Sequence, residues 1–195
     1  MKHGIKGRIT IVKNDKTLVD RPIKSFVRNA HNFIANLIGG CGLTQETAGN
    51  LSWNKYSLVD ETGATKEVIA TASPSSLQQY GNPSTFFHRI AIGLSGQAWS
   101  YEDYNLIQFY QNANAYSLKT HTTNAKTTVA FQGLFHFTEN QIISEVGLFG
   151  KWGLWCDDFG ELNPIVFLVS RDVLTPPLEV VVGDTIAVIY TIEVS

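Results

Sequence analysis

The densest group of acidic side chains in the sequence is Asp157-Asp158 with Glu161. Carboxylate oxygens at short spacing in a loop are the ligands that Ca²⁺ prefers. The spacing does not match an EF-hand loop, which needs alternating ligands, a central glycine and a distal glutamate. We therefore interpret this cluster as a solvated loop and predict no metal site there.

The remaining reactive side chains also lack the spacing that catalysis needs. No H-x-H or H-E-x-x-H pattern joins the five histidines, which are His3, His31, His88, His121 and His136. Gly93-Leu-Ser-Gly96 is one residue too short for the G-x-S-x-G nucleophile elbow and is typical of a turn. The sequence has no phosphate-binding loop or dinucleotide fingerprint either. These patterns predict a protein that is not an enzyme and has no cofactor.

The two cysteines, Cys41 and Cys156, lie far apart and form no C-x-x-C pair. This spacing does not indicate a zinc knuckle or a redox pair. We expect two free buried thiols, and a single disulfide between them remains open because it depends on their distance in the fold.

Aromatic side chains are concentrated in two stretches, where they alternate with amides, glycines and acids. They are Trp99, Tyr101, Tyr104, Phe109 and Tyr110 in the first stretch, and Trp152 and Trp155 in the second, which reads as a loop over residues 151–159. Aromatic faces beside carboxylates and amides can stack against pyranose rings. The same residues are also enriched in cores and in contacts between subunits. We favour the packing interpretation and keep a glycan-binding surface as the alternative.

The elements that must position these residues are mostly strands. Residues 7–12 alternate with period two and lead through Asn14-Asp15-Lys16 into a second short strand, which predicts an opening hairpin. Residues 126–137 alternate in the same way, and further strands are expected at 142–149, 165–169, 178–182 and 186–194. Gly183-Asp184 is expected to form the hairpin turn between the last two strands, and Pro176-Pro177 to interrupt pairing before them.

One segment changes to a helical period. Apolar residues follow one another at spacings of three and four from residue 23 to residue 38, after Pro22 and before Gly39-Gly40. The pattern predicts one N-terminal amphipathic helix. The fold class expected from all these elements is mainly β, an antiparallel β-sandwich resembling a jelly roll, with residues 1–42 forming the hairpin and helix and residues 43–195 forming the sandwich body.

Composition limits the classes of partner. The 195 residues are 44% hydrophobic and only 16% charged, with a formal net charge of −2. This is a globular composition without the basic surface that nucleic-acid binding requires. No run of apolar residues is long enough for a signal peptide or a membrane span, so we expect a protein made in a cytoplasm with no membrane or nucleic-acid partner.

Opposite charges fall on neighbouring C-terminal strands, where Glu145 and Arg171 could pair across the sheet. The alternative is that Arg171-Asp172 only turns the chain before the two prolines. The sequence leaves both interpretations open.

Several segments carry a resemblance to a known group of proteins. They are Ser25-Phe-Val-Arg-Asn-Ala-His-Asn-Phe-Ile34, Ile90-Ala-Ile-Gly-Leu-Ser-Gly96, Ser100-Tyr-Glu-Asp-Tyr104, Ile143-Ser-Glu-Val-Gly-Leu-Phe-Gly150 and the strands from Val169 to Ile192. In this order they resemble small structural proteins encoded by tailed bacteriophages and related viruses. The resemblance implies a virion component on the capsid or tail, with a β-sandwich body and no enzymatic activity.

The expected function is therefore that of a decoration, cement or tail protein located in the virion. Its partners would be other copies of itself, most simply in a trimer or a higher ring, and other virion proteins. The alternative is a receptor-binding or glycan-binding module of a viral tail fibre or spike, whose partner would be a host surface glycan.

Overall fold

The fold is described from a computed structural model of the chain. The structure describes residues 5–23, 25–32, 43–45, 51–53, 55–69, 87–122, 127–156 and 162–194. Strands dominate these residues, and all their pairings are antiparallel. The mainly β, antiparallel fold expected from the alternating sequence is thus confirmed.

The strands follow one another along the chain with a few short breaks. They are β1 (Ile5–Lys13), β2 (Lys16–Pro22), β3 (Leu43–Gln45), β4 (Leu51–Trp53), β5 (Lys55–Val59), β6 (Thr65–Ile69), β7 (Phe87–Gly93), β8 (Phe109–Asn114), β9 (Tyr116–Thr122), β10 (Thr127–His136), β11 (Gln141–Cys156), β12 (Leu162–Val180) and β13 (Thr185–Val194).

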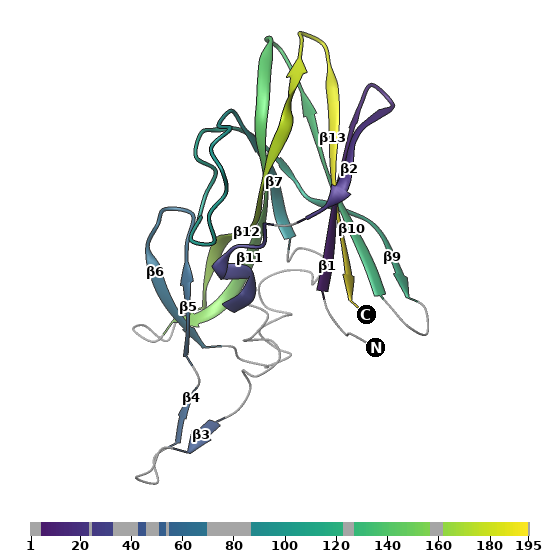
Figure 1. Ribbon diagram of the computed structural model, residues 1–195. Coiled ribbons are helices and arrows are strands. Elements are labelled where there is room, and N and C mark those ends of the chain that lie inside the picture. Colours follow the sequence, from purple (N-terminus) through teal and green to yellow (C-terminus); the bar gives the residue numbers. More distant parts are fainter. Residues whose placement is uncertain are drawn as a thin grey trace.

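The strands form two large sheets and one small pair. The first sheet has the order β2-β1-β13-β10-β9, and the second has the order β5-β6-β11-β7-β8 with β12 paired to β11. Figure 1 shows the first sheet on the right, the second on the left, and the β3–β4 pair apart from both. The chain passes from β8 at the edge of one sheet directly into β9 at the edge of the other.

The main hydrophobic core lies where the two large sheets face each other. Alternate residues of β10 and β13 point into it, including Phe135, Val188 and Tyr190, each fully buried. They meet buried residues of β7 and β11 such as Ile92 and Leu148. Period-two burial follows the period-two sequence because successive side chains of a strand point to opposite faces.

The opening hairpin forms as its turn residues predict. Asn14 and Asp15 both have positive φ, at 46° and 65°. A two-residue turn of this kind matches the twist of the paired strands. β1 and β2 are joined by this turn and pair antiparallel.

Of the two expectations for the C-terminal strands, the first is confirmed and the second is wrong. Pro176-Pro177 interrupts the pairing with β11, because Val173 pairs with Glu145 and Leu178 pairs with Ile143, and residues 174–177 between them drop out of the ladder at a register shift; β12 nevertheless runs through both prolines and pairs again beyond them. The shift lets the extra residues bulge out of the ladder, where a proline needs no partner. Gly183-Asp184 is a turn, but it carries the chain from β12 in one sheet to β13 in the other, so it closes no hairpin.

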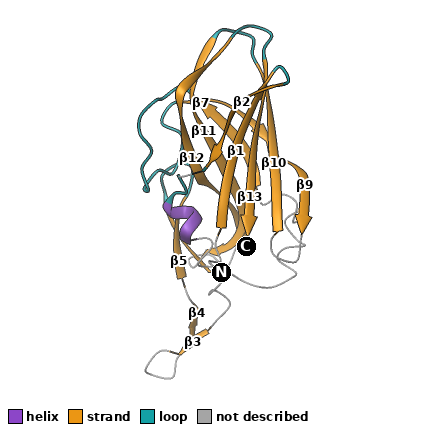
Figure 2. Ribbon diagram, turned by 45° about the vertical axis from the view of Figure 1, so that its right-hand side comes forward, coloured by secondary structure: helices purple, strands orange, loops and turns teal. Residues whose placement is uncertain are grey.

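The N-terminal helix begins at residue 28, five residues later than the residue 23 expected from the sequence. Helix occurs only at residues 28–32 of the described chain, and residues 33–42 lie outside the description. Residues 25–27 are extended instead, because their backbone bonds to β12: Arg171 N–H donates to Ser25 O at 3.3 Å, and Val27 N–H donates to Val169 O at 3.2 Å. We call residues 23–32 the strap. Figure 2 shows its helix beside a long loop, the one that follows β7.

Candidate functional site

The loop after β7, residues 94–108, is attached to the sheet through a buried arginine. Arg171 lies on β12 with its side chain fully buried, and its Nε donates to Glu145 Oε2 at 2.6 Å. The other guanidinium nitrogens reach the loop: Nη2 donates to Gln97 O at 2.9 Å, and Nη1 lies 3.0 Å from Asp103 Oδ2 and 3.3 Å from Ala98 O. The Glu145–Arg171 pair named from the sequence is therefore present, and it extends to the loop.

Glu145 holds the far end of the same loop. Its carboxylate accepts hydrogen bonds from the backbone N–H of Ile107 at 3.2 Å and of Gln108 at 2.8 Å. Asp103 also accepts from Ser100 N–H at 2.8 Å. Both ends of the loop are thus bonded to one buried ion pair, which fixes the course of its backbone.

The strap supports the middle of the loop. Arg28 N–H donates to Tyr101 O at 2.8 Å, and the Arg28 guanidinium lies 5.8 Å from the centre of the Tyr101 ring. Arg28 also pairs with Glu102. The strap itself is fastened by Asn29, whose side chain donates to Val59 O at 2.7 Å and accepts from Val59 N–H at 2.9 Å.

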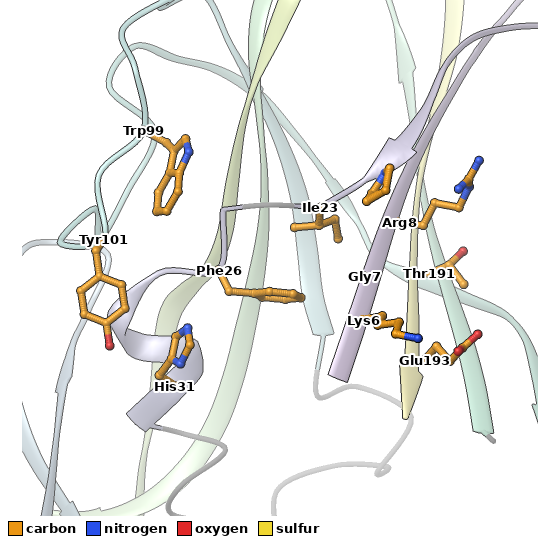
Figure 3. A pocket seen from close by; sticks show the side chains of 11 residues that line it. Lys6, Gly7, Arg8, Ile23, Phe26, His31, Trp99, Tyr101, Thr191 and Glu193 are labelled. Carbon is orange, nitrogen blue, oxygen red and sulfur yellow. The ribbon is translucent and has the colours of Figure 1, made fainter. Parts of the chain in front are cut away.

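A pocket of about 710 Å³ opens between this loop, the strap and the β1–β13 ladder. Figure 3 shows Trp99, Tyr101 and His31 on one side of it, Phe26 and Ile23 between, and polar residues of β1 and β13 on the other side. The lining residues are Lys6, Gly7, Arg8, Pro22, Ile23, Phe26, His31, Trp99, Tyr101, Thr191 and Glu193. Its volume lies within the range of about 300–1,000 Å³ typical of small-molecule sites.

Only part of the aromatic set predicted from the sequence reaches this pocket. Trp99 and Tyr101 line it. Tyr104 lies against Gly63 in the turn between β5 and β6, away from the pocket. Phe109 is exposed on β8, while Tyr110 stacks on Phe137 with ring centres 6.3 Å apart.

The second aromatic stretch is placed differently from its expected loop. Residues 151–156 belong to β11, so Trp152 and Trp155 are strand residues, paired with Ile165 and Leu162 of β12. Their side chains lie outside the described residues. The same is true of Cys156, while Cys41 and the acidic cluster of Asp157, Asp158 and Glu161 lie wholly outside the description.

A second buried polar cluster lies on the opposite face of β12. Asp172 is 4% exposed and accepts a hydrogen bond from the Ser170 hydroxyl at 2.9 Å. Burial raises the pKa of Asp172, partly offset by the Ser170 hydrogen bond and the nearby Arg21 charge. The Tyr190 side chain is fully buried beside this cluster, and burial together with the Asp172 charge raises the pKa of Tyr190.

The raised pKa of Asp172 predicts how the stability of an Asp172→Asn variant depends on pH. The pKa of Asp172 is higher in the folded chain than its ordinary value of 3.8. The protonated Asp172 side chain therefore contributes its full share of stability below pH 3.8, and this share is lost as the pH rises through the pKa of the folded state. Asp172→Asn is therefore expected to melt at the same temperature as wild type near pH 3 and at a higher temperature near pH 7. Calorimetry across this range measures the difference.

Asp184→Asn is the control with the opposite sign. Hydrogen bonds from Lys13, the Val181 N–H and Asn14 lower the pKa of Asp184 to about 2, so its contribution is present above 3.8 and lost toward pH 2. That variant should melt below wild type near pH 7. An Asp172→Asn protein that is less stable than wild type at pH 7 contradicts the prediction.

The described residues contain neither a cluster of metal-binding side chains nor a membrane-spanning helix. No group of three or more histidine, cysteine or acidic side chains comes together in a way that could hold a metal ion. No helix among them is long and apolar enough to cross a membrane.

Comparisons with protein-family models, curated proteins and solved structures found no match for this chain.

Sequence reasoning missed several residues of the site. Asp103 lies inside the Ser-Tyr-Glu-Asp-Tyr segment, but nothing in that segment indicates an arginine partner 68 residues further on. The helical spacing of apolar residues predicts one continuous helix that includes Phe26 and His31, and nothing in that spacing indicates that both residues line a pocket. Gly7 also lines the pocket, and a Cβ there would lie 2.6 Å from Ile23 and 2.9 Å from Phe26, a close approach that no pattern in the sequence indicates.

Proposed function

We propose that this chain is a non-enzymatic structural protein with an antiparallel β-sandwich body that assembles with copies of itself through the free edge of β8. The observation that carries the proposal is the chemistry of this edge. Among the strands that the structure describes, β8 pairs with β7 on one side and ends the order of its sheet on the other. Its sequence, Phe-Tyr-Gln-Asn-Ala-Asn, has no charge, proline or glycine.

Exposed strand edges are usually protected against pairing with another chain by charges, prolines or a covering segment. The other described edges of the two large sheets have such protection. β2 carries Lys16, Asp20, Arg21 and Pro22, and β9 carries Lys119 and His121. β5 is covered by Asn29 and Asn32 of the strap, and β12 by strap residues 25–27.

The surface around β8 has the composition of an interface. Phe109 is 48% exposed and Tyr116, just after the strand, is 62% exposed. Ile107 precedes them and is also exposed. Aromatic residues beside uncharged amides are enriched at the centre of protein interfaces, whereas charged residues are depleted there.

A second copy of the chain is the partner that this edge fits best. An antiparallel strand pair formed by two β8 edges is related by a two-fold axis, so each copy satisfies the other's free backbone groups. The uncharged amide side chains of Gln111, Asn112 and Asn114 bring no like-charge repulsion to such a pair. Placement of the assembly on a virus capsid or tail rests on the sequence resemblance.

The test is the mass of the purified chain by light scattering at several concentrations. Wild type is expected to form an oligomer of discrete size. Phe109→Lys places a charge on the edge and should weaken association at least about tenfold, toward the 21.6 kDa monomer.

Leu134→Lys is the matched control. Leu134 is 47% exposed, almost the same as Phe109, but lies on β10 in the interior of the other sheet. This variant should keep the wild-type mass. A wild-type chain that stays monomeric up to about 1 mM, or a Phe109→Lys chain that assembles like wild type, contradicts the proposal.

A further inference from the structure

We propose that the pocket between the loop 94–108 and the β1–β13 ladder binds an uncharged oligosaccharide, with Trp99 and Tyr101 as its stacking surface. This is a function separate from assembly, since neither residue belongs to β8 or its flanking surface.

The aromatic side offers flat apolar surface to solvent. Trp99 is 40% exposed and Tyr101 is 42% exposed, and both border the same cavity. Figure 3 shows the two rings one above the other on one side of the pocket, with Phe26 and Ile23 beyond them. The C–H faces of a pyranose ring pack against such rings, and each aromatic side chain loses the freedom of only two torsions on binding.

The opposite side supplies hydrogen-bonding groups of both kinds. Lys6 and Arg8 of β1 lie across the ladder from Glu193 and Thr191 of β13. Lysine and arginine donate, a carboxylate accepts, and a hydroxyl does both. Sugar hydroxyls, which also donate and accept, complement this mixture.

The charges on this side favour an uncharged ligand. Two cations and one carboxylate line the pocket, so charges of both signs border the space that a ligand would occupy. A strongly acidic ligand would meet Glu193, and a strongly basic one would meet Lys6 and Arg8. A small number of polar groups beside an apolar surface is the usual lining of a small-molecule site.

The aromatic side is fixed before any ligand arrives. The backbone on one side of Trp99 is held by Arg171, which binds the carbonyls of Gln97 and Ala98, and on the other side by Asp103, which binds Ser100 N–H. Tyr101 is held by Arg28 N–H on its carbonyl and by the edge of the His31 ring, 5.4 Å away. A loop ordered in advance lowers the entropic cost of binding.

The experiment begins with a glycan array that carries neutral and sialylated oligosaccharides, and continues with calorimetry on the strongest neutral binder. Wild type is expected to bind a neutral saccharide with a Kd below about 10 mM. Trp99→Ala and Tyr101→Ala should each weaken that binding at least about tenfold. Both side chains are exposed, so melting temperatures should stay close to wild type.

Tyr104→Ala is the matched control, because Tyr104 is an equally exposed tyrosine of the same loop outside the pocket. It should bind like wild type. Three results overturn the proposal: no neutral saccharide binds, only sialylated saccharides bind, or the Tyr104→Ala and Trp99→Ala variants lose binding equally.

Repeating the calorimetry with Phe109→Lys separates this inference from the assembly proposal. The Kd per site should be unchanged in that variant whatever its mass, because β8 contributes nothing to the pocket lining. If Phe109→Lys loses both assembly and saccharide binding, the ligand must lie between two subunits. That result would overturn the proposal that one chain forms the whole site.

Discussion

Replacing Arg171 by methionine is expected to lower the free energy of unfolding by about 3–5 kcal/mol, because it leaves buried carboxylates without their counter-charge. Glu145 would keep only its backbone N–H donors, and Asp103 would lose the cation that lies 3.0 Å from it. The Gln97 and Ala98 carbonyls would lose their donors as well. Urea denaturation followed by far-UV circular dichroism measures the loss.

Arg8→Met is the matched control for this prediction. The Arg8–Asp20 pair has both side chains nearly half exposed and screened by solvent, so its removal should change the free energy of unfolding far less than the loss of Arg171. In the double variant Glu145→Gln/Arg171→Met, the buried charge on Glu145 is removed together with its partner. The double variant should therefore lose less free energy of unfolding than Glu145→Gln and Arg171→Met lose together, by about 1–3 kcal/mol. An Arg171→Met protein as stable as Arg8→Met would contradict the role assigned to the buried pair.

Gly93→Ala is the second substitution with a large expected effect, a loss of about 1–3 kcal/mol. A Cβ at Gly93 would lie 2.5 Å from Glu145 Oε1 and 2.6 Å from the carbonyl oxygen of Gln108. Neither atom can move away freely, since Glu145 is bound to Arg171 and Gln108 O accepts from Leu94 N–H at 2.9 Å. The added methyl group must therefore distort the point where the loop leaves and rejoins the sheet.

Gly96→Ala provides the comparison within the same loop. Nothing lies within 4 Å of a Cβ built at Gly96. That variant is expected to stay within about 0.5 kcal/mol of wild type, or to gain slightly because alanine restricts the unfolded chain. Equal stability of the two alanine variants in urea would show that the close approach at Gly93 is unimportant.

The strands whose two faces differ in burial could be predicted from the sequence. In β10, Phe131, Gly133 and Phe135 are buried and alternate with Gln132, Leu134 and His136, which are half-buried or exposed, because one face meets the core and the other meets solvent. For β11, the sequence predicts that a strand is present but does not predict which residues of the strand are buried. Residues 143–150 are buried on both faces, since the loop and the strap cover the side that the main core does not.

The strap shows why the spacing of apolar residues predicted a helix where residues 25–27 are extended. Val27 and Ala30 are buried, as the helical stripe required, but Val27 reaches its position in an extended segment that bonds to the edge of β12. Hydrogen bonds to a neighbouring strand outweighed the local preference for a helical turn. Such bonds leave no trace in the spacing of apolar residues.

The candidate site was predictable only in part, for a related reason. Glu145 and Arg171 have opposite charges on adjacent strands, a pairing that sequence spacing can suggest. The remaining partners of Arg171 include two backbone carbonyls, which every residue possesses and which no motif marks. The sequence indicates Trp99, Tyr101, Tyr104 and Phe109 as candidates alike. Only Trp99 and Tyr101 line the pocket, because the path of the loop carries Tyr104 and Phe109 away from it.

The position of β13 has a consequence for how the chain folds during synthesis. β13 lies between β1 and β10 in its sheet, and Val194 pairs with both Ile5 and Thr127. The opening β1–β2 hairpin and the β9–β10 pair therefore stay separate on the ribosome until β13 emerges behind them. Pairing of residues so distant in sequence is slow and leaves strand edges exposed meanwhile. We expect the first sheet to close only after β13 has left the exit tunnel, so the edges of β1 and β10 stay unpaired with β13 until then.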